Sequence, residues 1–250
     1  MNRARHIAIG LIVITAAAIF TVAVMRICAT RRPHVELERD LFPVMGIDLS
    51  AHNGDVEFDK VAEAGVSFVF LKASEGTTFR DPKFKENYEA ARKAGIRTGA
   101  YHFFRFDGDG YDQGRNFLDA VDSLDLDLPL AIDIEEWGSP ENCSTDKVVE
   151  SIRGMIFALE GCRHKVILYT NKRGYERFVR GRLDEMPVWV CSFTNPPITT
   201  DNWTLWQHSH ESHIDGIKGK VDLNTFNGDS LSWETWLDAV NNERPTRLMQ

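Results

Sequence analysis

The sequence predicts an α/β fold, a TIM-like barrel with five βα units followed by three short strands. Short apolar runs alternate with amphipathic helical segments over residues 44–182, and three further apolar runs follow without full helices between them. The chain has 250 residues and 43% hydrophobic content, which is enough for one large core. Eight strands at this length favour a closed barrel. A doubly wound open sheet is the main structural alternative, although no glycine-rich phosphate loop follows any strand.

The expected elements follow from local pattern. The strands are short apolar runs, at residues 44–49, 66–73, 96–104, 128–134, 165–170, 188–193, 203–208 and 220–223. The helices carry apolar residues at spacings of three and four, at residues 58–64, 84–94, 113–124, 145–160 and 172–182. Glycines at positions 65, 95 and 161 mark the ends of three of these helices.

The amino-terminal segment departs from the composition of a soluble domain. An uncharged run of 19 residues begins at Ile7 and ends at Met25, with arginines on both sides. This length just spans the hydrocarbon core of a bilayer. We expect residues 1–29 to form a membrane anchor rather than a cleaved signal peptide, because the apolar run continues past the small residues 16–18. Residues 30–42 are then a tether, residues 43–240 a catalytic barrel and residues 241–250 a tail.

The apolar run at residues 128–136 ends in carboxylates. If residues 128–134 form a buried strand, Asp133 and Glu135 share one face, with alpha carbons about 6.5–7 Å apart. Barrels place their active sites at this carboxyl end of the strands. Two acids so close cannot both ionise freely, so the more desolvated one should keep its proton and be able to donate it. Solvated strand-end carboxylates are the alternative, and Glu136, which points the other way, is expected at the surface.

The overall charge bears on the class of partner. The formal net charge is −8, which argues against nucleic acid. The same charge gives no long-range attraction towards an anionic polymer such as a bacterial wall. Any sugar must therefore be held by local contacts.

Motifs at successive strand ends resemble a known family. In chain order they are Gly-Ile-Asp-Leu-Ser at 46–50, Phe-Leu-Lys-Ala-Ser-Glu-Gly-Thr-Thr-Phe at 70–79, Gly-Ala-Tyr-His-Phe at 99–103, Asp-Ile-Glu at 133–135, Tyr-Thr at 169–170, Trp-Gln at 206–207 and Val-Asp-Leu-Asn-Thr-Phe-Asn-Gly at 221–228. This ordered set resembles glycoside hydrolase family 25, the Chalaropsis-type lysozymes, over about residues 44–229.

The resemblance implies an N-acetylmuramidase that cleaves the β-1,4 bond between N-acetylmuramic acid and N-acetylglucosamine. By position, Glu135 is the implied general acid, and Asp48, Asp133 and Asp222 are the accompanying carboxylates. Retention could use a carboxylate nucleophile or the substrate's own acetamide, and we favour the acetamide route with Asp133 orienting that group. The resemblance requires no metal or organic cofactor. It implies a peptidoglycan glycan strand as partner, a place in the cell envelope and a monomeric enzyme.

Five side chains at or beside strand ends are candidates for sugar binding. They are Tyr101, Trp206, Lys72, Tyr169 and Trp137. Flat aromatic rings can stack on pyranose faces, although a core position is the alternative for each ring. Lys72 could instead pair with Glu75.

The histidines and cysteines predict no metal site. His208, His210 and His213 have no acid or cysteine at a convincing spacing and are expected in a solvated loop, and His102 is expected to be a hydrogen-bonded strand residue. The cysteines, at positions 28, 143, 162 and 191, match no common zinc pattern. Cys143 and Cys162 could pair in an exported protein, although the helix between them would hold its ends apart.

One departure from the family pattern affects the rim of the site. The family usually has a tyrosine where this chain has Phe193, so a hydroxyl group is missing there. Two other functions remain open from the sequence, namely hydrolysis of another N-acetylated glycan such as chitin, and wall binding without catalysis.

Overall fold

The computed structural model describes residues 37, 39–137, 143–193 and 203–242. The strands are β1 Met45–Leu49, β2 Phe68–Glu75, β3 Phe79–Arg80, β4 Arg97–Phe103, β5 Leu130–Asp133, β6 Val166–Asn171, β7 Val188–Cys191, β8 Leu205–Ser212 and β9 Val221–Phe226. The α-helices are α2 Phe58–Glu63, α3 Phe84–Lys93, α4 Gly110–Val121, α5 Thr145–Gly161, α6 Lys172–Gly174 and α7 Ser230–Asn242. A 3-10 turn, η1, covers Ala51–Asn53, and a π-helical turn, η2, covers Tyr175–Val179.

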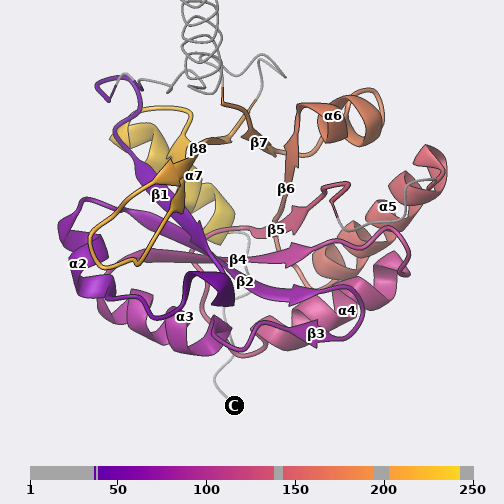
Figure 1. The fold of residues 1–250 in the computed structure, drawn as a ribbon. Helices are drawn as coiled ribbons and strands as arrows, with labels where there is room; N and C mark the ends of the chain where they lie inside the picture. Colours follow the sequence, from indigo (N-terminus) through magenta and orange to yellow (C-terminus); the bar gives the residue numbers. More distant parts are fainter. Residues whose placement is uncertain (1–36, 38, 138–142, 194–202, 243–250) are drawn as a thin grey trace, which may run out of the picture. The chain divides into compact units, whose positions relative to one another are not determined.

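Eight strands close into a barrel, which confirms the predicted fold. Their order is β1-β9-β8-β7-β6-β5-β4-β2, and a further pairing between β1 and β2 closes the ring, with β3 added at the side of β2. The alternative of an open doubly wound sheet is therefore wrong. Helices α2, α3, α4 and α5 follow one another along the outside of the strands (Figure 1).

The last part of the barrel differs from the expected pattern in strand direction. β9 runs antiparallel to both of its neighbours, β1 and β8. The physical reason is the short connection from β8 to β9, because a parallel strand needs a crossover of about a dozen residues or more. The fifth predicted helix is also different, since it consists of the short α6 followed by η2.

Alternate side chains of each strand enter two separate apolar clusters. The outer cluster joins strand residues such as Ile132 and Leu168 to the helices through residues such as Met155. The inner cluster fills the barrel with larger rings, including Phe70 and Trp189, whose centroids are 4.6 Å apart. This period of two decides which side chains can face a ligand inside the barrel.

A glycine on β4 makes room for the inner rings. A Cβ atom at Gly99 would lie 2.7 Å from the ring of Phe70, closer than side-chain contacts allow. The glycine therefore allows the backbone of β4 to pass next to the phenylalanine. The packed rings form a solid floor below the carboxyl ends of the strands.

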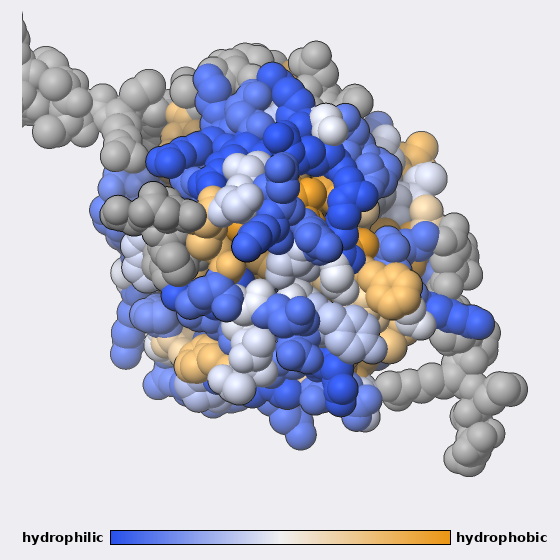
Figure 2. All heavy atoms as spheres, turned by 90° about the vertical axis from the view of Figure 1, so that its right-hand side faces the viewer, coloured by the Kyte–Doolittle hydropathy of each residue, from blue (hydrophilic) through white to orange (hydrophobic). Residues whose placement is uncertain are grey.

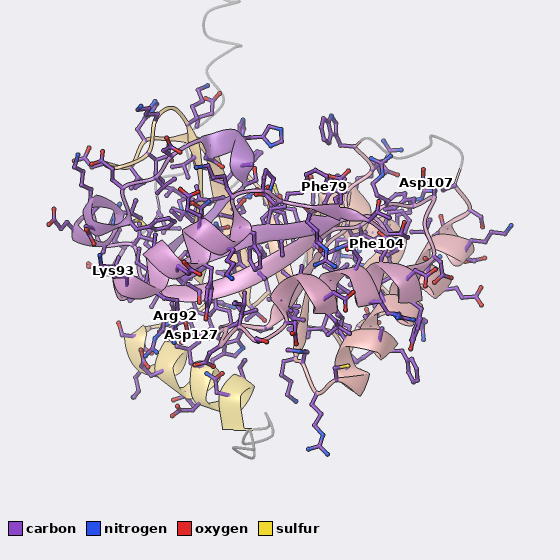
Figure 3. The ribbon with its side chains drawn as sticks, turned by 90° about the horizontal axis from the view of Figure 1, so that it is seen from below. Phe79, Arg92, Lys93, Phe104, Asp107 and Asp127 are labelled. Carbon is purple, nitrogen blue, oxygen red and sulfur yellow. The ribbon has the colours of Figure 1, made fainter. Side chains whose placement is uncertain are left out.

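Helix α7, which the sequence reading did not predict, covers the opposite end of the barrel. Trp233 stacks on Phe68 at the start of β2, with 5.1 Å between ring centroids, and also packs against Phe226. At the same end, Arg92 of α3 donates to Asp127 over 2.7 Å, and the two residues lie together in Figure 3. This end is thus closed by aromatic packing and ion pairs, so an open site must lie at the carboxyl ends.

The predicted anchor, residues 7–25, lies outside the described residues. Within the described ranges, no helix is long and apolar enough to cross a membrane.

Candidate active site

A cavity of about 320 Å³ opens at the carboxyl ends of the strands. Its lining is rich in acids and aromatic rings and consists of Asp48, Ser50, His52, Lys72, Tyr101, Phe103, Asp133, Glu135, Trp137, Tyr169, Trp189, Gln207 and Asp222. Strands β2 and β4 point to the right in Figure 1, and Figure 2 views the molecule from that side. This face is mainly hydrophilic, and hydrophobic side chains show in a hollow near its centre (Figure 2).

The four predicted carboxylates all line this cavity, although they come from distant parts of the chain. Asp48 on β1 is the direct cross-strand partner of Asp222 on β9. Asp133 is the last residue of β5, and Glu135 follows it by two positions. Both lie on the side of the cavity, as the alternation of side chains predicts. The barrel therefore brings two pairs of acids to one rim.

Asp48 is held by two amide groups. Its Oδ2 accepts a hydrogen bond from Gln207 Nε2 at 2.9 Å and another from Asn224 Nδ2 at 2.8 Å. Each amide is fixed in turn by an aromatic side chain, because Tyr169 donates its hydroxyl to Gln207 Oε1 and Trp189 donates Nε1–H to Asn224 Oδ1, both at 2.8 Å. Burial raises the pKa of Asp48, and the hydrogen bonds from the amides oppose that rise.

Asp222 is the cross-strand partner of Asp48, and the two carboxyl groups can share a hydrogen bond when one of them carries a proton. Burial, followed by the charge of Asp48, raises the pKa of Asp222 to about 8. The folded protein therefore holds a proton here that the unfolded chain loses above about pH 4.

Because of this linkage, we expect Asp222→Asn to stabilise the fold. Below about pH 4 the raised pKa of Asp222 does not change the free energy of unfolding. As pH rises to about 8 it lowers that free energy increasingly, because the unfolded chain has lost a proton that the folded protein still holds. Asparagine removes that cost and can still donate to Asp48. The gain should be on the order of 2 kcal/mol at pH 8 and smaller at pH 5, even though activity falls. Thermal unfolding at both pH values checks this, and an equal gain at the two values would contradict it.

Asp133 is the most desolvated acid of the set. It is buried, and its Oδ1 has no hydrogen-bond partner among the described residues. Burial first, and then the charges of Glu135 and Asp48, raise its pKa well above the usual range. An unpartnered polar atom aimed at a cavity is costly unless a ligand supplies the missing contact.

Glu135 is less buried than Asp133 and has a different environment. Burial raises its pKa, a hydrogen bond from Asn171 lowers it, and the charge of Asp48 raises it further. The net direction is upward, as the sequence predicts, but burial is a larger cause than the neighbouring charges. In the unliganded protein the pKa of Asp133 is thus raised more strongly than that of Glu135.

Three of the four predicted aromatic residues reach the cavity. Tyr101, Tyr169 and Trp137 line it, and the side chain of Trp137 is 80% exposed. Trp137 meets Phe103 edge-on, with 6.2 Å between ring centroids. An exposed ring beside a cavity can stack on a sugar face.

Lys72 forms one of the two contacts that the sequence left open, and the contact with the sugar stays a prediction. Its Nζ lies 2.7 Å from Glu75 Oε2, so it forms the ion pair, and it also lines the cavity. The ammonium group lies over the ring of Phe103 at 5.0 Å from its centroid.

The assignment of Trp206 to the sugar platform is wrong. Its side chain is fully buried in the outer cluster, and its Nε1 donates to the carbonyl of Ser192. Because side chains alternate along β8, the residue that faces the cavity is its neighbour Gln207. Trp189, Gln207 and Asn224 are important residues of the site that the sequence pattern did not predict. The alternation of side chains between the two faces of each strand was the signal that could have identified them.

Other predicted residues lie apart from the chemistry. His102 is buried between Ser74 and Gln113, with hydrogen bonds of 2.8 and 3.2 Å, and burial lowers its pKa to about 3. This agrees with a structural role. Phe193 packs against His210, with 4.3 Å between ring centroids, and lies outside the cavity lining.

The predicted surface position of Glu136 needs correction. It forms ion pairs with Arg173, at 2.6 Å, and with Arg177, and its side chain is only 24% exposed. Arg177 also donates to the carbonyl of Cys143, so these contacts connect the two sides of the loop that follows β5.

Cys143 and Cys162 are free thiols, so the pairing that the sequence left open is not formed. In the described part of the chain, no group of three or more histidine, cysteine or acidic side chains is arranged to hold a metal ion.

Comparisons with known proteins agree with this geometry. The sequence model of the family described as glycosyl hydrolases family 25 matches residues 47–217 of this chain. The chain is 32% identical to YegX of Escherichia coli K12 over 206 residues, covering 80% of this chain and 75% of the relative. It is 33% identical to lysozyme M1 of Streptomyces globisporus over 204 residues, which cover 76% of this chain and 69% of that lysozyme.

A solved structure shows the same fold. The family 25 glycosyl hydrolase from Bacillus anthracis superposes with a TM-score of 0.74 at 29% identity, covering 82% of this chain and 98% of that one. The matched family region contains Asp48, Asp133 and Glu135. The chain belongs to glycosyl hydrolases family 25 and is a glycoside hydrolase.

Proposed function

We propose that the protein is a peptidoglycan hydrolase, a lysozyme that cleaves the β-1,4 bond between N-acetylmuramic acid and N-acetylglucosamine. The observation that carries this proposal is the convergence of Asp48, Asp133, Glu135 and Asp222 on one cavity, with the exposed ring of Trp137 beside it. Relatives named as lysozymes support the choice of substrate.

We assign the role of general acid to Glu135. Burial raises its pKa, which favours the protonated carboxyl that a general acid needs to protonate the leaving oxygen. Asp48, Asp133 and Asp222 complete the catalytic set. Tyr101, Tyr169, Trp137 and Lys72 are the proposed contacts to the sugar.

Asp133 is assigned to the acetamide group of the sugar. Its unpartnered Oδ1 can accept the acetamide N–H, and such a hydrogen bond stabilises the charged form of the carboxyl and lowers its pKa. Binding of substrate would therefore make Asp133 the anion and leave the proton on Glu135. The acetamide oxygen then attacks the anomeric carbon, and water completes hydrolysis with retention.

Digestion of purified peptidoglycan tests the substrate and the bond. We expect new reducing ends on N-acetylmuramic acid, detected by borohydride reduction and mass spectrometry of the products. Release of products from chitin, and not from peptidoglycan, would favour chitin or a similar N-acetylated glycan as the substrate. Binding to the wall without any product from either polymer would favour a non-catalytic wall protein.

The acetamide route has its own test. Proton NMR of the first product formed should show the β-anomer, and a thiazoline analogue of the cyclised acetamide should inhibit competitively. An α-anomer as first product would exclude retention. Retention without inhibition by the thiazoline would favour a carboxylate nucleophile.

We also propose that residues 1–29 anchor the enzyme in the membrane, with residues 30–42 as a tether and residues 241–250 as a tail. The 19-residue apolar run supports the anchor, and a substrate in the wall requires an exported barrel at residues 43–240. Protease added to spheroplasts should digest the barrel, whereas a mature protein lacking residues 1–25 would exclude the anchor. The detergent-solubilised enzyme is expected to be a monomer by light scattering.

A further inference from the structure

Four hydrogen-bonded side chains hold Asp48 at the wall of the cavity. In order they are Tyr169, Gln207, Asn224 and Trp189, from strands β6, β8, β9 and β7. Tyr169 and Trp189 hold the oxygen atoms of the two amides, and the two amide nitrogens hold Asp48 Oδ2. These contacts connect five strands of the barrel at its catalytic rim.

The direction of these hydrogen bonds is fixed by chemistry. An indole nitrogen only donates, so the oxygen of Asn224 must face Trp189 and its NH2 group must face Asp48. The amide of Gln207 takes the same sense, since its Oε1 accepts the hydroxyl of Tyr169 and its Nε2 donates to Asp48. Two N–H groups directed at one carboxyl oxygen stabilise the ionised form of Asp48.

Asp222 lacks such support. Among the described residues, its carboxyl receives no amide N–H, and its hydrogen bond is to Asp48. The two carboxyl groups therefore differ in their affinity for a single shared proton. A proton on Asp48 would compete with two amide N–H donors for the carboxyl group, whereas a proton on Asp222 would meet no such competition.

We propose that Gln207 and Asn224, oriented by Tyr169 and Trp189, are positioning residues that place the one proton of the Asp48–Asp222 pair on Asp222 and keep Asp48 as the permanent anion of the site. An anion fixed at this position can stabilise the positive charge that develops on the sugar ring. This last consequence rests on the proposed function, whereas the position of the proton does not.

The other titratable groups around the cavity do not replace Asp48 in this role. They are Lys72, His52, Tyr101, Tyr169, Cys191, Asp133 and Glu135. Burial raises the pKa of both tyrosines well above the usual range and that of Cys191 to about 12, so these three stay neutral. The two remaining acids belong to the other pair.

The test is a titration of the free enzyme. The full chain, solubilised in mild detergent and labelled with ¹³C at aspartate carboxyl carbons, is titrated by NMR, and Asp222→Asn identifies the signals of the pair. Gln207→Met and Asn224→Leu each remove one donor. We expect each to move the first ionisation of the pair upward by about one pH unit. The acidic limb of kcat/KM on wall should move by a similar amount.

A milder variant and a matched control complete the experiment. Tyr169→Phe removes only the hydroxyl that orients Gln207, so it should fold and give a smaller shift in the same direction. Gln113→Met makes the same substitution at a buried glutamine that contacts His102 and Arg105, and it should leave the titration of the pair unchanged.

The outcomes are distinct. If the first ionisation stays in place in Gln207→Met, Asn224→Leu and Tyr169→Phe, or moves to lower pH, the proposal is overturned. A uniform loss of kcat/KM at every pH, without movement of the acidic limb, would indicate a structural role and also overturn it. If the wild type shows no wall hydrolysis, the proposed function fails, and the titration still decides the position of the proton.

Discussion

Glu135→Gln is expected to reduce activity on intact wall by roughly 100-fold or more, which is the scale of general acid catalysis. Glutamine keeps the shape of the side chain and its place next to Asn171, but it has no proton to donate. A substrate with a good leaving group, such as an aryl glycoside, needs little protonation. Cleavage of the first bond in that substrate should therefore be largely restored in the variant, as measured by release of the aryl group.

The neighbouring residue offers a matched control. Glu136→Gln makes the same chemical change one position along the chain, at a carboxylate that pairs with Arg173 and Arg177 outside the cavity lining. It should keep most of the activity on wall and show no preference for the activated substrate. If Glu135→Gln retains near-full activity on wall, Glu135 is not the acid, and Asp222, the member of the Asp48–Asp222 pair that holds the proton, becomes the next candidate.

Asp133→Asn is expected to be equally damaging for a different reason. The amide cannot carry the negative charge that orients and polarises the acetamide, and loss of such a preorganised contact costs roughly 100-fold or more. Protonation of the leaving group is not the missing step. The activated substrate should therefore leave Asp133→Asn impaired, in contrast to Glu135→Gln. Rates on wall and on the aryl glycoside, measured side by side for both variants, give the comparison.

A partly buried aspartate at the other end of the barrel, Asp127, is the control for this change. Asp127 accepts hydrogen bonds from Thr98 and Arg92, far from the cavity lining. Asp127→Asn should lower thermal stability with little effect on the ratio of the two rates. If Asp133→Asn and Glu135→Gln respond alike to the activated leaving group, the separate roles assigned to these two acids are wrong.

Much of the site follows from strand parity, which is local. Asp133 and Glu135 were placed on one face because side chains alternate along an extended chain, and both line the cavity. The same rule separates Trp206 from Gln207. Choosing Trp206 for its ring overlooked that parity, and the structure buries Trp206 among the helices and directs Gln207 inward.

The main physical cause of the raised pKa values could not be obtained from the sequence. The acids next to one another in the sequence suggested repulsion as the main cause, but burial is the largest cause for Asp48, Asp133, Glu135 and Asp222 alike. Burial depends on how far each strand end extends beyond the packed rings of Phe70 and Trp189, and that depth is set by the stagger of the closed barrel.

By itself, the sequence determined the alternation of strands and helices, the barrel class, the family and the four acids, because each depends on periods of two or three to four residues or on short motifs. Only the tertiary structure decided the direction of β9 and the environment of Asp48. The two amides that hold Asp48 lie 159 and 176 residues away in the sequence. They meet it because β1 pairs with β9, and β9 with β8, when the barrel closes. A long-range contact of this kind depends on register and closure, which no local pattern specifies.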